Sequence, residues 1–177
     1  MTKLKTLNVS RCNLAALPDN IGNLSSLTWL KVSGNHLTSL PDSLGDLTNL
    51  KRLDIEDNQL EALPGSIGSL QKLRKLTVYK NRLKSVPMGI LKIKKFTQLE
   101  FKENEITALP ANLIEDGGHV TGLFFENNQI YSLPEGLEKL DRLTTLSLRN
   151  NPLALQTESV HASLQALKDR GCNVFLD

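Results

Sequence analysis

The sequence predicts an α/β solenoid, in which short units stack to bury one continuous core. Three observations support this. Each unit begins with alternating apolar and polar residues, and six of seven units carry an asparagine at a fixed place. Self-similarity of this kind is typical of repeat proteins, whose units bury their apolar faces only against one another. The third is a period of 23 residues, with one step of 24, in the leading apolar residues Leu4, Leu27, Leu50, Leu73, Phe96, Val120 and Leu143.

The first segment of each unit is expected to be a short strand. In the unit that starts at Leu50, Leu53 and Ile55 alternate with Asp54 and Glu56. A period of two buries one face of a strand and exposes the other. Stacked strands of this kind form a parallel sheet, with Leu53 and Ile55 inward and Asp54 and Glu56 outward.

An asparagine should end each strand, because its amide both donates and accepts hydrogen bonds where the sheet no longer serves the backbone. A proline column then favours an extended return, since proline has a fixed φ and no N–H. The return side is wider than the strand spacing, so the strands should lie on the concave side. The asparagines are Asn35, Asn58, Asn81, Asn104, Asn128 and Asn151, and the prolines are Pro18, Pro41, Pro64, Pro87, Pro110 and Pro134.

Aligned units share L-x-x-L-x-L-x-x-N-x-L, followed by L-P-x-x-I-x-x-L. This pattern resembles the leucine-rich repeat family. Its second half resembles the intracellular subgroup that includes the Ras-suppressor proteins, and many bacterial repeat proteins share it. The resemblance spans Leu4 to Leu153 and implies a leucine-rich repeat horseshoe with a parallel sheet on the concave face, where family members bind partner proteins. One unit shows it in full: Leu50, Leu53, Ile55, Asn58, Leu60, Leu63, Pro64, Ile67 and Leu70.

We expect a single domain over residues 1–177, with repeats starting at 4, 27, 50, 73, 96, 120 and 143 and a C-terminal helix-strand cap over 154–177. The cap should contain a helix from Thr157 to Asp169, stopped at Gly171, and a strand from Cys172 to Leu176. The helix should turn Val160, Leu164 and Leu167 inward. The first unit has no matching cap, so its apolar edge at Leu7, Val9 and Leu14 is the site of an alternative function, self-association.

Composition and motifs argue against several classes of function. The formal net charge of +2 gives no electrostatic case for nucleic acid. No apolar stretch reaches the 18 residues of a membrane span. His36, His119 and His161 lack metal-ligand spacing, and catalytic motifs are missing. We therefore predict no enzyme activity, no cofactor and no metal.

The two cysteines indicate a reducing compartment. Cys12 and Cys172 should lie at opposite ends of the stack, roughly 30 Å apart, which is too far for a disulfide. Extracellular relatives usually carry disulfide-bonded caps, and no apolar signal precedes Leu4. We expect the cytoplasm, or the host cytoplasm for a bacterial effector. Cys12 stands at the asparagine position of its unit and is expected to pack there.

The concave face is the predicted binding surface. Trp29, Tyr79 and Phe124 come from alternate units and should lie roughly 10 Å apart. Exposed aromatic residues are typical anchors of protein interfaces. Basic residues gather where the strands start and acidic residues where they end, which can orient a partner. The candidate residues flanking the aromatic ones are Lys31, Arg52, Asp54, Glu56, Lys75, Glu100, Lys102 and Glu126.

The sequence therefore predicts a non-catalytic module, monomeric or weakly dimeric, that binds a protein on its concave face as a signalling scaffold or a bacterial effector. Neither the scaffold nor the effector role identifies the partner, because one repeat scaffold serves many targets. Lys92, Lys94 and Lys95 are expected on the convex side.

Overall fold

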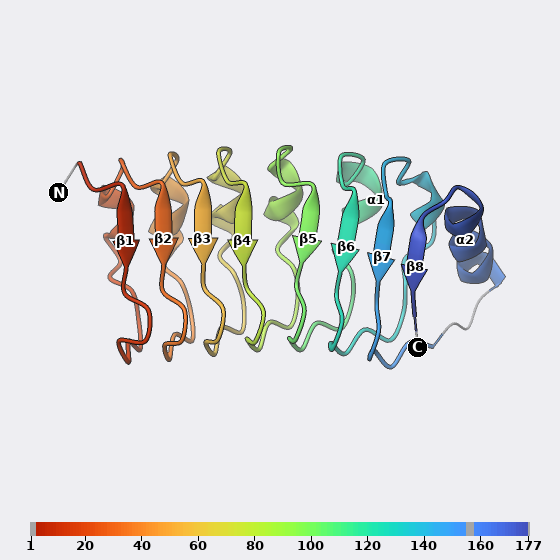
Figure 1. Ribbon diagram of the computed structural model, residues 1–177, viewed down its shortest axis with the longest axis horizontal. Helices are drawn as coiled ribbons and strands as arrows, with labels where there is room; N and C mark the ends of the chain where they lie inside the picture. The colour runs from red at the N-terminus through yellow and green to blue at the C-terminus, as the bar shows by residue number, and fades with distance from the viewer. Residues whose placement is uncertain (1–2, 155–157, 177) are drawn as a thin grey trace.

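The computed structural model describes residues 3–154 and 158–176, which form one elongated stack (Figure 1). Within each of two sheets, neighbouring strands pair in parallel, and the register sets equivalent positions of adjacent repeats side by side, as with Leu30 and Leu53. This confirms the predicted solenoid. The strands are β1 (Thr6–Asn8), β2 (Trp29–Lys31), β3 (Arg52–Asp54), β4 (Lys75–Thr77), β5 (Gln98–Glu100), β6 (Gly122–Phe124), β7 (Thr145–Ser147) and β8 (Asn173–Phe175).

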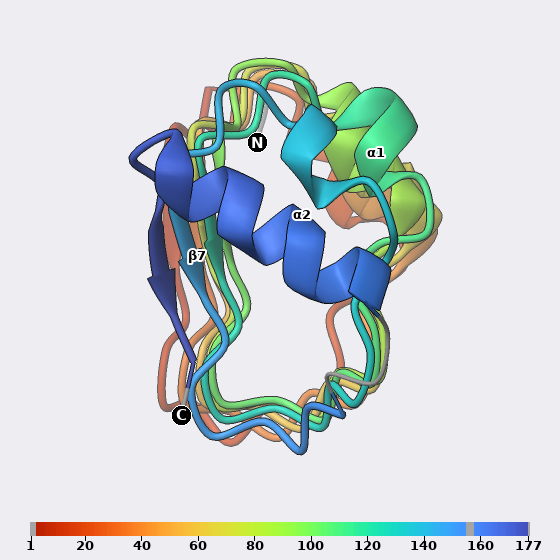
Figure 2. The same cartoon turned by 90° about the vertical axis from the view of Figure 1, so that its right-hand side faces the viewer.

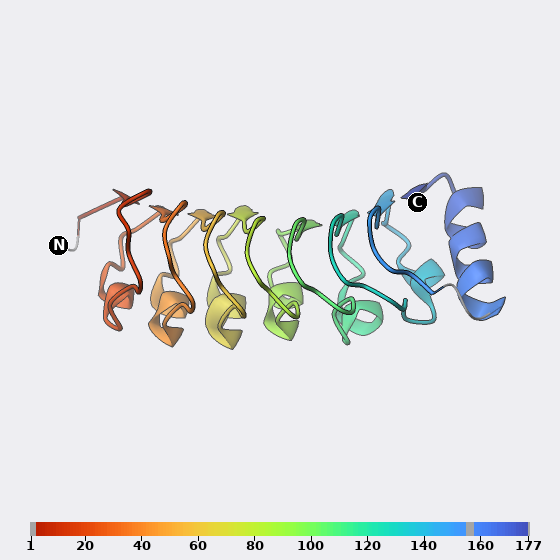
Figure 3. The same cartoon turned by 90° about the horizontal axis from the view of Figure 1, so that it is seen from below.

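Short helices line the side opposite the strands (Figure 3). Pro41, Pro64 and Pro87 are extended, with ψ of 148°, 144° and 132°, and each directly precedes a 3₁₀ helix. The fixed φ of proline therefore delivers the extended return predicted. The row of strands dips gently between the two ends in Figure 3, so the strand side is the concave one. The 3₁₀ helices are η1 (Ile21–Asn23), η2 (Asp42–Asp46), η3 (Gly65–Ser69), η4 (Met88–Lys92) and η5 (Leu137–Lys139).

The fifth repeat carries the extra residue and has a one-turn α-helix, α1 (Leu113–Asp116), instead of a 3₁₀ helix. The helix ends at Gly117, where a Cβ atom would collide with the Leu113 carbonyl oxygen. The segment that contains α1 absorbs the insertion, since Gln98 of β5 still pairs with Gly122 of β6 and the strands stay in register.

Each asparagine of the ladder joins two repeats. Asn58 is 9% exposed. Its Oδ1 accepts a hydrogen bond from the Leu37 N–H of the preceding repeat at 3.1 Å. Its Nδ2 donates to the carbonyls of Val32, at 3.2 Å, and Ile55, at 3.1 Å. The other ladder asparagines repeat this arrangement, so the predicted structural role is confirmed.

A column of left-handed residues immediately precedes the asparagines. Asp57, Lys80, Glu103, Asn127 and Asn150 have φ between 53° and 57°, and Gly34 has φ of 66° at the equivalent place. Side chains disfavour this conformation, which only glycine adopts without strain. The repeated turn therefore imposes a steric cost in most units.

The sheet is interrupted once, between β4 and β5, whereas the sequence suggested a continuous sheet. The strands form two four-stranded sheets, β1–β4 and β5–β8, and Figure 1 shows the wider spacing at this seam. The core changes here from aliphatic to aromatic. Val78 lies on one side, and Phe96 and Phe101 lie on the other, with the Phe101 ring stacked on Phe125 at 5.7 Å. The rings alone do not open the sheet, because β5 and β6 remain paired beside the stacked Phe101 and Phe125.

A helix and a strand cover the last repeat. Helix α2 (Glu158–Asp169) lies across the end of the stack in Figure 2, and β8 pairs with β7. Val160, Leu164 and Leu167 are buried as predicted. Gly171 has φ of 87° and ends the helix. Thr157, the expected first helical residue, lies outside the described residues, as do 155, 156 and 177.

Candidate functional site

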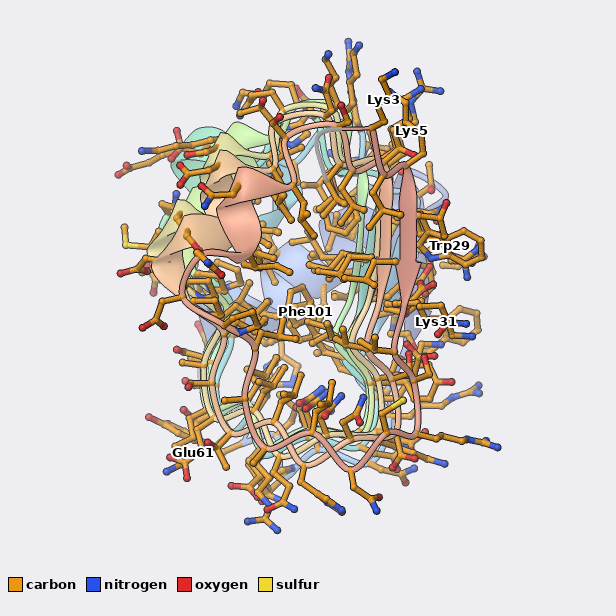
Figure 4. The ribbon with its side chains drawn as sticks, turned by 90° about the vertical axis from the view of Figure 1, so that its left-hand side faces the viewer. Lys3, Lys5, Trp29, Lys31, Glu61 and Phe101 are labelled. Carbon is orange, nitrogen blue, oxygen red and sulfur yellow. The ribbon has the colours of Figure 1, made fainter. Side chains whose placement is uncertain are left out.

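The candidate site is the strand face, which consists of the outward side chains of β1–β8 and of the residues just after each strand. Viewed from the N-terminal end, Trp29 and Lys31 project away from the stack on this side, whereas Phe101 lies inside it (Figure 4). Alternation along each strand produces this division. The strand face is therefore the broad surface on which neighbouring repeats place side chains next to each other.

Trp29, Arg52 and Asp54 form a compact cluster across β2 and β3. The indole Nε1 of Trp29 donates to Asp54 Oδ2 at 2.8 Å. Arg52 Nε donates to the same oxygen at 2.7 Å, and the Arg52 guanidinium lies 4.6 Å from the centroid of the Trp29 ring. The Thr77 hydroxyl of β4 lies 2.8 Å from Asp54 Oδ1 and 2.7 Å from Glu56 Oε2. Three repeats are joined by this network.

Asp54 is only 1% exposed, although its strand position points outward. Burial on its own raises the pKa of this carboxyl, but hydrogen bonds from Arg52, Thr77 and Trp29 outweigh burial and bring the pKa below its ordinary value. Asp54 is thus an ionised, fully bonded group that holds the cluster in place. It contributes to the shape of the surface rather than to direct contact.

Two more aromatic rings on the strand face are covered by cations. Lys102 Nζ lies 5.2 Å from the Phe124 ring centroid and 3.3 Å from Glu126 Oε1. The Arg149 guanidinium lies 4.9 Å from the Phe175 ring of β8. Attraction between a cation and an aromatic face restrains both side chains.

Beyond the ends of β1–β4 the strand face is hollowed. The hollow has a volume of about 550 Å³, and Lys31, Ser33, Glu56, Tyr79 and Lys80 are among its lining residues. Tyr79 is 40% exposed and borders the hollow. The site therefore combines restrained aromatic–cation pairs with an open, charged depression.

Comparison with known proteins agrees with this geometry. A family model described as leucine-rich repeat region matches residues 1–76. A leucine-rich repeat protein of Leptospira interrogans has a similar solved structure, with a TM-score of 0.77 and 31% identity over 85% of this chain. The chain is a leucine-rich repeat protein. No curated protein sequence matches it.

Two further solved structures are similar. One is the leucine-rich repeat ectodomain of the Arabidopsis thaliana receptor kinase GASSHO1/SCHENGEN3 in complex with CASPARIAN STRIP INTEGRITY FACTOR 2, with a TM-score of 0.72 and 28% identity over 86% of this chain. The other is an internalin of Listeria monocytogenes, with a TM-score of 0.70 over 99% of this chain, whose 23% identity shows the fold alone. This leucine-rich repeat protein covers 38% of the Leptospira protein, 19% of the plant ectodomain and 55% of the internalin.

The predicted anchors of this leucine-rich repeat protein do not form a straight row. Trp29 begins β2, Phe124 ends β6, and Tyr79 lies beyond the end of β4, so the three lie at different heights on the strand face. Trp29 is also half-buried by its contacts with Arg52 and Asp54. Tyr79 is the anchor that stays open.

Other predicted residues fall into separate places. Lys75 and Glu100 are exposed on either side of the seam, where both line one hollow. Sequence reasoning missed Phe175, which is 38% exposed. The period-two alternation could have found it. Val174 packs against the core, so the next residue of the cap strand, Phe175, is expected to point outward.

The sequence predicts Lys95 with Lys92 and Lys94 on the convex side, and this prediction is wrong for Lys95. It lies beside Arg74 and lines the seam hollow, whereas Lys92 belongs to η4 on the opposite side. The reason is that Lys95 follows the turn after η4 and directly precedes Phe96, where the chain already enters the strand side. The three lysines therefore do not share a surface.

Reactive groups are sparse in the described part of the chain. Cys12 is exposed, contrary to the packing expected for it, because the asparagine position of the first repeat faces solvent. Burial raises the pKa of the Cys172 thiol and lowers that of His119.

Residues 3–154 and 158–176 contain no cluster of three or more His, Cys, Asp or Glu side chains that could hold a metal ion. No helix among these residues is long and apolar enough to cross a membrane.

Proposed function

We propose that this leucine-rich repeat protein is a non-catalytic binding module whose protein partner lies across the strand face. One observation carries the proposal: three aromatic rings on this face are each covered by a cation from an adjacent strand or repeat. The pairs are Trp29 with Arg52, Phe124 with Lys102, and Phe175 with Arg149.

Such pairs suit protein recognition for a physical reason. Aromatic and arginine side chains supply most of the energy in many interfaces. Side chains already restrained in the free protein lose less freedom when a partner binds, so more of the contact energy contributes to affinity. The open charges of Lys31, Glu56 and Lys75 add orientation and discrimination between partners.

The test starts with capture of a partner and continues with calorimetry on the purified pair. Tyr79→Ala and Phe124→Ala should each weaken binding by about 1–3 kcal/mol. Tyr131→Ala is the matched control, because Tyr131 is 56% exposed and lies in a return segment away from the strand face. If Tyr131→Ala abolishes binding while the two strand-face variants bind normally, the proposal is wrong.

We further propose that the protein works in a reducing compartment, the cytoplasm of its own cell or, for an effector, of a host cell. Cys12 follows β1 and Cys172 directly precedes β8, and these strands lie at opposite ends of the row of strands (Figure 1). The two free cysteines therefore cannot bridge each other, which supports this proposal. Expression of the protein as a fluorescent fusion, imaged together with markers of each compartment, tests the location. Accumulation outside the cytoplasm of both cells contradicts it.

A second candidate function is self-association through the end that holds β1. An apolar hollow of about 370 Å³ lies there, and Leu7, Val9, Leu14 and Leu24, all only partly buried, are among its lining residues. A second copy of the chain could cover it and pair with the outer edge of β1. Light scattering over a dilution series should then show dimers that dissociate, and Leu14→Glu should leave monomers at every concentration. Persistent monomers in the unmodified protein contradict this candidate.

A further inference from the structure

A second depression opens where the two sheets separate. It has a volume of about 300 Å³, and its walls include Arg74 and Lys75 from the fourth repeat and Lys95, Thr97, Gln98 and the acidic Glu100 from the fifth. The strands on its two sides, β4 and β5, are not paired. The depression therefore lies between two strand edges that are open toward each other.

The open edges present backbone groups that the other junctions use up. Lys51 N donates to Thr28 O at 2.8 Å, Arg74 N to Lys51 O at 2.9 Å, and Thr121 N to Thr97 O at 2.8 Å. At the seam, within the described residues, the equivalent bond from Thr97 N to Arg74 O is missing, and Gln98 N also lacks its usual bond to that oxygen. Two donors and one acceptor thus remain at the wall of the depression.

Cations outnumber the carboxylate of Glu100 at this place. A smaller adjoining hollow of about 150 Å³ is lined by Lys51, Lys72, Arg74 and Lys95. Together with Lys75 these residues form the basic rim. All five are exposed, and within the described residues none of the five forms an ion pair with a carboxylate. Lys72 donates instead to the Asn49 amide oxygen at 2.7 Å.

We propose that the seam binds an acidic, extended segment of the partner protein. This rests on the proposed function and adds the chemistry of one contact. Carboxylates of the segment would bind the basic rim by charge-assisted hydrogen bonds. Its main chain would bond to the open edges of β4 and β5, as an added strand does.

The backbone groups favour a peptide over a free phosphate. A free phosphate is mainly an acceptor for the N–H groups of Thr97 and Gln98, and it offers the Arg74 carbonyl only a P–OH donor that it loses as it ionises. A peptide unit carries one donor and one acceptor and so satisfies both kinds of group. The rim then adds preference for aspartate and glutamate side chains.

Amide NMR of the whole chain tests the proposal with three probes: an oligo-aspartate peptide, an oligo-lysine peptide and inorganic phosphate. Oligo-aspartate should give saturable shifts at the Thr97 and Gln98 amides, and neither other probe should. The double variant Arg74→Gln/Lys95→Gln should weaken binding at least about tenfold at low salt, and the loss should be smaller at high salt, where screening already weakens the charges of the unmodified protein. The charge-retaining Arg74→Lys/Lys95→Arg should keep it.

Arg82→Gln/Lys92→Gln is the matched control, since it removes one arginine and one lysine that are exposed outside the basic rim. Equal loss in both neutral double variants, or a saturable phosphate shift at Thr97 and Gln98, overturns the proposal. So does a peptide that leaves these amides unmoved. The titration needs no natural partner, so its failure leaves the proposed function to be decided by Tyr79→Ala and Phe124→Ala.

Discussion

The Trp29 indole N–H is hydrogen-bonded to the Asp54 carboxylate at 2.8 Å, so the sole tryptophan is bonded to the one buried carboxylate among the described residues. A residue that sequence pattern assigns to partner contact is thereby also a structural residue. Loss of the indole would remove an anchor and leave Asp54 short of a donor. For this reason, binding losses in Trp29 variants need a parallel measurement of stability.

Acid should weaken the fold through Asp54. Its pKa is lowered on folding, so its ionised form stabilises the protein above the unfolded value of 3.8, and that stability is lost as pH falls through the lower folded pKa. Chemical denaturation should therefore show a steeper loss of unfolding free energy below about pH 4 in the unmodified protein than in Asp54→Asn. The exposed Asp19→Asn should follow the unmodified protein, and identical slopes for all three would contradict this role.

Asn58→Ala should lower the unfolding free energy by about 1–3 kcal/mol, because the Leu37 N–H and the Val32 and Ile55 carbonyls lose a buried partner. Thermal or denaturant unfolding measures the change. Asn20→Ala is the comparison, since Asn20 is exposed and its side chain does not cap η1. Similar losses in both variants would mean that the ladder bonds carry no special weight.

Relief of the left-handed column should stabilise the protein. Lys80→Gly removes an unfavourable side chain at φ of 55° and should raise the unfolding free energy by up to about 1 kcal/mol. Gly34→Ala should lower the unfolding free energy, since this residue has a φ of +66° and an added Cβ would lie 2.9 Å from Arg11 Cγ. Glu105→Gly, at an exposed position without positive φ, should also be destabilising. A loss for Lys80→Gly as large as for Glu105→Gly would rule out this explanation.

The two thiols should differ sharply in reactivity. Cys12 is exposed, whereas Cys172 is buried and its pKa is raised by burial. Titration with a disulfide reagent under native conditions should label only one cysteine per chain, and mass spectrometry should place the label at Cys12. Denaturant should release the second. Fast labelling of Cys172 in the folded protein would show that the cap opens readily.

Much of the fold follows from the 23-residue spacing, because each repeat meets the same local conditions. The buried leucines, the asparagine bonds and the cap helix with Val160, Leu164 and Leu167 all match expectation. The left-handed column was not predicted, since Lys80 and Glu103 give no local signal for positive φ. The hint comes from other repeats, where residue types that tolerate this conformation stand at the same place, namely Gly34, Asp57, Asn127 and Asn150.

The seam could not be predicted either, because the 23-residue spacing continues unbroken across it from Leu73 to Phe96. Phe96 and Phe101 fit the apolar pattern as well as leucine does, yet they accompany a change in strand spacing. The same limit applies to the strand face. Pattern places Trp29 and Asp54 outward, but only three-dimensional packing shows that Arg52 and the indole cover the carboxylate.

The separation of β4 from β5 also has an elastic consequence. A repeat stack whose junctions are alike bends evenly, with each junction sharing the deformation. Here the junction between residues 77 and 98 lacks strand pairing, while its neighbours keep theirs. Flexing should therefore concentrate there, so the arc of the whole protein should depend mainly on the angle between two four-stranded blocks.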